Sequence, residues 1–67
     1  MKEYTYKNYR IKVGPVANQL VAHIWRPNSG LIMSGGTITV SLEEGEDILI
    51  QRVEKRINEE EAKENNN

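Results

Sequence analysis

Polar and apolar residues alternate in several short segments along the first two thirds of the chain, and this period of two predicts β-strands. In the segment YRIKV, Tyr9, Ile11 and Val13 alternate with Arg10 and Lys12, as in a strand with one buried and one open face. The segment GPVANQ follows as a connection, because glycine and proline interrupt regular structure. The pattern therefore predicts a first strand that ends before this connection.

Two places interrupt the alternation. Tyr4 and Tyr6 lie in the opposite phase to the apolar residues of YRIKV, so we expect a bend or bulge near Lys7–Asn8 if the two segments pair. Further along, the segment LIMSGGTITVS is predicted to be a strand that the pair Gly35–Gly36 interrupts or bulges. After the glycine pair the alternation is regular again.

The segment LVAHIWR supplies a further predicted strand, and PNSG between it and LIMSGGTITVS has the residues of a hairpin turn. Only one phase of LVAHIWR can face a core, because a shift of one residue moves every side chain to the other face. Tryptophan is usually well buried, which favours the phase of Trp25. The other phase holds three aliphatic residues, which favours it instead, and we expect that phase to be buried. The residues predicted to point inward are Tyr9, Ile11, Val13, Leu20, Ala22, Ile24, Ile38 and Val40.

The segment SLEEGEDILIQRVEKRINEEEAK, residues 41–63, is predicted to be a helix. Ser41 and Glu44 have the spacing of a capping box, in which each side chain satisfies a free backbone N–H group. Acidic residues follow in the first turns, where the helix dipole favours anions. Ile48 points away from the apolar stripe and has no obvious partner. The stripe itself consists of Leu42, Leu49, Ile50, Val53 and Ile57.

The order of these elements is strand, strand, strand, helix, with short connections. It predicts the α+β class, with a three-stranded antiparallel β-meander and one C-terminal helix packed on one face. We expect a single domain over residues 1–58 and a frayed or disordered tail over residues 59–67, which are poor in apolar side chains. Because one helix covers only one face of a sheet, the other face is expected to meet water or a partner.

Composition supports a small protein of the cytoplasm. The chain has 67 residues and contains no cysteine, so its core is small and no disulfide staples it. No apolar run approaches the roughly 18 residues of a membrane helix, and the N-terminal segment MKEYTYKNYR does not have the pattern of a signal peptide. We therefore expect a soluble protein that does not enter a membrane.

Charge is distributed unevenly along the chain. Residues 1–42 contain five basic residues and one acidic residue, whereas residues 43–67 contain four basic and nine acidic residues. A basic part of this kind can face nucleic acid. It can equally arise because a solvated helix favours glutamate and strands carry lysine against aggregation.

The uncovered sheet face is the candidate binding surface. Cations around an aromatic ring, with hydroxyls nearby, suit a polyanion that carries bases, because Lys and Arg neutralise phosphates and Trp offers a stacking surface. The alternative is a protein partner, as in an uncharacterised phage or bacterial accessory protein, or a homodimer formed through the same face. The candidate residues for either partner are Arg10, Lys12, His23, Trp25, Thr37 and Thr39.

Several short motifs follow one another in an order found in known DNA-binding domains. Tyr9–Arg10 opens a strand, AHIWRP at Ala22–Pro27 has the form A-x-I-x-x-P, and Gly36–Thr37 precedes SLEE at Ser41–Glu44. This order, over residues 9–57, resembles DNA-binding domains of the plant ethylene-response-factor type, and the layout resembles the arm-binding domain of tyrosine-type integrases. The resemblance implies that the uncovered sheet enters the major groove. The matching outward residues are Arg10, His23 and Trp25.

Catalysis and metal binding have little support in the sequence. Nucleophilic catalysis by a single histidine needs an orienting carboxylate and a placed nucleophile, and the serines are explained by a turn, a strand kink and a helix cap. The acidic cluster Glu43–Asp47 lacks the spaced oxygen ligands of a cation loop. The glycine-rich SGGT at Ser34–Thr37 opens no helix and has no lysine, unlike a phosphate-binding loop. We therefore expect no enzymatic activity, metal or cofactor.

Overall fold

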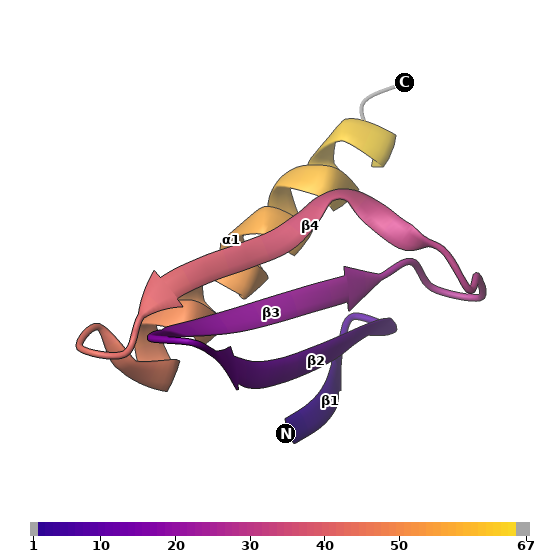
Figure 1. Cartoon of the computed structure of the whole chain (residues 1–67). Coiled ribbons are helices and arrows are strands. Elements are labelled where there is room, and N and C mark those ends of the chain that lie inside the picture. The colour runs from indigo at the N-terminus through magenta and orange to yellow at the C-terminus, as the bar shows by residue number, and fades with distance from the viewer. Residues whose placement is uncertain (1, 66–67) are drawn as a thin grey trace.

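The computed structural model describes residues 2–65, which form one antiparallel sheet and one C-terminal helix (Figure 1). The predicted α+β class, antiparallel sheet and C-terminal helix are confirmed, but the sheet has four strands and not three. Each strand pairs with its neighbours in chain order, which makes the sheet a simple meander. The elements are β1 (Lys2–Tyr6), β2 (Tyr9–Val16), β3 (Gln19–Trp25), β4 (Ile32–Ser41) and α1 (Gly45–Asn65).

The additional strand is β1, which a two-residue turn at Lys7 and Asn8 joins to β2. Both turn residues have a positive φ, 51° for Lys7 and 71° for Asn8, as a type I′ hairpin turn requires. The prediction of a bend or bulge at this point is therefore wrong. A two-residue turn places Tyr6 directly opposite Tyr9 on the same side of the sheet, and this pairing accounts for the change of phase in the sequence.

An irregularity in β4 confirms the predicted interruption at Gly35–Gly36. The register between β3 and β4 shifts here, and Gly35 has a φ of 68°. A Cβ atom on Gly36 would lie 2.7 Å from the carbonyl oxygen of Met33 and 2.9 Å from that of Ile24. Only glycine fits where two backbone segments approach so closely. The bulge also turns Met33 into the core, where the sequence pattern does not place it.

The helix begins later than residue 41. Ser41 and Glu44 do form the predicted reciprocal hydrogen bonds: Ser41 N–H donates to Glu44 Oε1 and Glu44 N–H donates to Ser41 Oγ, both at 3.3 Å. They close a turn ahead of the helix, however, because Gly45 has a φ of 86° and α1 starts there. Leu42 consequently lies outside the helix and is exposed, so its place in the apolar stripe is wrong.

The core lies between one face of the sheet and α1. All of the strand residues predicted to point inward are buried or pack against this core. Of the predicted helix stripe, Leu49, Val53 and Ile57 are buried and Ile50 is half-buried. Ile48, for which the sequence offers no partner, packs against the core as well. The buried core residues are Tyr9, Ile11, Val13, Ala22, Ile24, Met33, Val40, Leu49, Val53 and Ile57.

The last part of α1 is held by a buried carboxylate. The helix continues to Asn65 through most of the segment predicted as a frayed tail, whose residues 66–67 lie outside the described part of the chain. Glu60, near the start of that segment, is only 8% exposed. Buried carboxylates need partners, and Glu60 has two.

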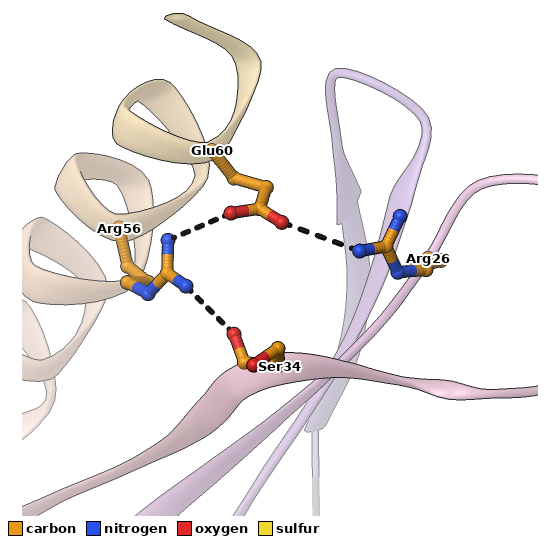
Figure 2. A network of polar contacts seen from close by, with 4 residues as sticks. All are labelled: Arg26, Ser34, Arg56 and Glu60. Carbon is orange, nitrogen blue, oxygen red and sulfur yellow. Dashed lines mark hydrogen bonds and ion pairs between the residues drawn. The ribbon is translucent and has the colours of Figure 1, made fainter. Parts of the chain in front are cut away.

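Figure 2 shows the polar network around this carboxylate, which links α1 to the end of β3 and to β4. Glu60 Oε2 lies 3.3 Å from an Arg26 guanidinium nitrogen, and Glu60 Oε1 lies 3.4 Å from one of Arg56. Arg56 also donates to the carbonyl oxygen of Ser34 at 2.7 Å. The network therefore ties the C-terminal half of the helix to the bulged end of the sheet.

Candidate binding face

The face of the sheet opposite α1 is uncovered, and we call it the open face (Figure 1). Its residues alternate along each strand with those of the core, and the strand register brings them into rows. Arg10 is paired with Trp25, and Lys12 is paired with His23. All of the residues predicted as a site lie on this face: Arg10, Lys12, His23, Trp25, Thr37 and Thr39.

Four of these residues form a connected group. Lys12 Nζ lies 5.5 Å from the centroid of the Trp25 ring, a cation–π distance. The His23 ring meets the same Trp25 ring edge-on, with centroids 6.1 Å apart. Thr37 Oγ1 lies 3.4 Å from His23 Nδ1, within hydrogen-bonding distance. Trp25 is half-buried among these neighbours, whereas Ile24 on the opposite side of β3 is fully buried in the core. The phase of β3 that holds the aliphatic residues therefore faces the helix, as predicted.

The electrostatic character of the open face depends on Arg10 and Lys12. The other three basic residues of the first 42 point toward the helix: Lys2 lies 2.9 Å from Glu46, Lys7 lies 2.6 Å from Asn58, and Arg26 lies 3.3 Å from Glu60. Much of the charge asymmetry along the chain therefore reflects contacts between sheet and helix. On the open face itself, Glu3 lies 3.9 Å from Lys12 and partly offsets its charge.

A small hollow opens beside the predicted residues, and the sequence pattern did not reveal it. It exists because Gly14, which has no side chain, occupies an open-face position opposite Val21 on the next strand. Its volume is about 90 Å³. The prediction that the strand ends before Gly14 is wrong, because β2 continues to Val16. Only the cross-strand pairing shows that this glycine lies in the outward phase of a strand. The lining includes Gly14, Pro15, Val16, Val21, Lys12 and His23.

Apolar side chains are exposed at the other end of the open face. Ile32 is paired with Trp25 across β3 and β4 and is 48% exposed, and the preceding Leu31 is 70% exposed. Leu31 belongs to the loop between β3 and β4, which projects at one end of the sheet (Figure 1). An exposed apolar group beside a tryptophan is a feature of protein-contact surfaces, and the hydrophobic pattern placed these residues in a strand without indicating their exposure.

Residues 2–65 contain no group of three or more His, Cys, Asp or Glu side chains that could hold a metal ion. Within the same range, α1 is not apolar enough to cross a membrane, nor is any other helical segment.

The resemblance to sheet-plus-helix DNA-binding domains names Arg10, His23 and Trp25 as outward residues, and these three do lie on the open face. The sheet differs from the expected three-stranded form by the additional strand β1. The resemblance itself stays a prediction. Comparison of the chain with protein-family models, with curated proteins and with solved structures finds no match.

Proposed function

We propose that this protein is a non-enzymatic binding module that contacts nucleic acid through its open face. The observation that carries the proposal is the placement of Arg10 and Lys12, which stay on the uncovered face while the other basic residues of the first 42 point toward the helix. Both lie beside Trp25. Two cations and an aromatic ring on an open sheet form a surface that suits phosphates and bases.

Both cations are available to a phosphate. Arg10 is exposed, and no ion pair engages it among the side chains of residues 2–63. Lys12 has Glu3 as its acidic neighbour, but at 3.9 Å and with both side chains well exposed to water. Exposed pairs of this kind contribute only about 0–1 kcal/mol, so a phosphate competes easily with Glu3 for the ammonium group.

The proposed binding is weak and dependent on salt, and it does not rely on hydrogen bonds to base edges. Two cations neutralise two phosphates, and each released counterion makes the affinity fall with salt. No set of bidentate side chains spans the face to read base edges, which sequence-specific recognition in the major groove requires. Single strands suit such a surface, because their bases are free to contact the protein.

A fluorescence titration tests the proposal. An oligonucleotide added at about 50 mM salt is expected to change the emission of Trp25, because a phosphate bound to Lys12 brings a negative charge close to the ring that the ammonium group contacts. Replacing Arg10 and Lys12 by glutamine is expected to weaken binding by roughly tenfold for each cation at this salt concentration. Lys55→Gln, on the exposed side of α1, removes the same charge away from the face and serves as the control. Equal affinities for the double variant and the control would contradict the proposal.

A protein partner, including a second copy of this chain, is the second candidate for the same face. The exposed Ile32 beside Trp25, with Leu31 next to it, favours this candidate. Arg10 and Lys12 oppose a symmetric contact of two open faces, because like charges would meet there. Sedimentation at rising concentration tests self-association: a mass near twice 7.7 kDa that falls on Ile32→Ser supports it, and a monomer throughout excludes it.

A further inference from the structure

The hollow at Gly14 adds a shape requirement to the open face. Its volume of about 90 Å³ is far below the roughly 300–1,000 Å³ of sites that enclose a whole small molecule. It therefore suits one group of a larger ligand that lies across the face. Gly14, Val16 and Val21 make its lining largely apolar, so the group that enters must itself present apolar surface.

The remaining lining residues indicate what this group is attached to. Lys12 and His23 are the two nitrogen-bearing side chains of the hollow, and no acidic side chain lines it. Charge complementarity therefore favours an anion beside an apolar group. A nucleotide has this combination, because its base offers an apolar ring face and its phosphate lies within the same unit.

Trp25 is poorly placed to receive the base instead. The ammonium group of Lys12 lies over its ring at 5.5 Å, and the ring of His23 meets it edge-on. A base that stacked on Trp25 would have to displace Lys12 from the ring. The hollow lies on the other side of Lys12 and His23 and demands no such displacement, so Lys12 can hold the phosphate while the base enters the hollow.

We infer that the hollow formed at Gly14 receives one unpaired base of a single-stranded nucleic acid. This inference rests on the proposed function and names the class of its ligand. A paired base cannot enter, because its edge is held by its partner and extruding it from a duplex is costly. The small volume also admits a single ring more readily than a fused pair. The face therefore prefers single strands to duplexes and pyrimidines to purines.

The test compares three labelled probes by fluorescence anisotropy at about 50 mM salt: oligo-dT, oligo-dA of equal length, and a duplex of mixed sequence. Gly14→Val fills the hollow, and Gly14→Ala fills it partly. The backbone of Gly14 does not adopt a left-handed conformation, and β-branched residues suit strands, so the fold should tolerate either change. Gly30→Val, at a loop glycine outside the hollow with nothing within 4 Å of a new Cβ, is the matched control, and thermal unfolding checks each variant.

The expected result is tightest binding of oligo-dT, with Gly14→Val weakening it roughly tenfold, as for the loss of one base contact, and Gly30→Val leaving it unchanged. Equal binding of oligo-dT and duplex, or an unchanged affinity in both Gly14 variants, would overturn the inference about the hollow and leave the proposed function standing. If the wild-type protein bound none of the three probes, the proposed function itself would fail. A labelled acidic peptide added as a fourth probe makes a protein partner an outcome of the same test, and tighter binding of this peptide than of every oligonucleotide would also overturn the proposed function.

Discussion

The buried carboxylate of Glu60 offers a sharp test of how the helix is attached to the sheet. Glu60→Ala removes the acceptor that both Arg26 and Arg56 use. A hydrogen bond to a charged group contributes about 1.5–3 kcal/mol, but distances of 3.3 and 3.4 Å exceed the roughly 2.7–2.9 Å of strong charge-assisted bonds. The arginine side chains are also 41% and 22% exposed, so water solvates them again after the change.

We therefore expect Glu60→Ala to lower the free energy of unfolding by about 2 kcal/mol, less than the about 3–5 kcal/mol for breaking a fully buried pair. For a domain of this size, that loss lowers the melting temperature by roughly 8–16 °C. Urea unfolding followed by circular dichroism measures the free energy, with the exposed neighbour Glu59→Ala as a control of equal charge change. A difference between the two variants smaller than about 0.5 kcal/mol would refute the view that Glu60 holds the end of the helix.

Three further variants test other parts of the account. The hydroxyl of Tyr4 is buried without a hydrogen-bond partner among the described residues, and burial, then the charges of Glu54 and Glu46, raise the pKa of Tyr4 above its ordinary value. The folded state therefore keeps the phenol proton to a higher pH than the unfolded chain does, so the free energy of unfolding falls as pH rises above about 10. Tyr4→Phe should remove this fall and should add about 1 kcal/mol at pH 7. Unfolding curves at pH 7 and above about pH 10 measure both effects. Gly36→Ala forces backbone to move and should cost about 2–3 kcal/mol by urea unfolding, whereas Gly30→Ala, with nothing within 4 Å of the new Cβ, should change little; equal losses would contradict the close packing at Gly36. Asn8→Ala should destabilise the protein by about 1 kcal/mol because alanine resists a positive φ, whereas Asn8→Gly should not. Identical melting temperatures for the two variants would argue against the turn between β1 and β2.

The central strands and the helix face could be read from the sequence because two independent periodicities agree on them. The period of two places Ile11 and Ile24 inward, and the helical period places Leu49 and Val53 on the stripe that covers them. Once a single helix is assigned to one face, the opposite phase has to be open. The placement of Arg10 and its neighbours on that face follows from the same argument.

The sequence pattern does not predict β1 as a separate strand, because the turn that follows it lacks the usual residues of a hairpin turn. Type I′ turns favour Asn-Gly or Asp-Gly, whereas here Lys7 and Asn8 adopt the positive φ values. Lys7 gains a compensating contact far away in the sequence, with Asn58 on the helix, besides one with the ring of the neighbouring Tyr6. Contacts of this range are not visible in a local pattern.

Two other features depend on pairings across the fold. Glu60 belongs to a run of acidic residues that is typical of a solvent-exposed helix end. Its burial follows only from the position of Arg26, directly after β3. The hollow requires Gly14 to lie opposite Val21, which is set by the register of β2 and β3. Neither the register nor the helix–sheet contact can be derived from hydrophobic periodicity.

The salt dependence of oligonucleotide binding tests the central claim most directly. With Arg10 and Lys12 each neutralising one phosphate of a single strand, the logarithm of the association constant should fall with the logarithm of salt concentration with a slope of about −1.4. Lys12→Gln should reduce that slope to about −0.7, while Lys55→Gln should leave it unchanged. A slope near zero for the wild-type protein, or the same slope for Lys12→Gln, would contradict the claim that this face binds nucleic acid.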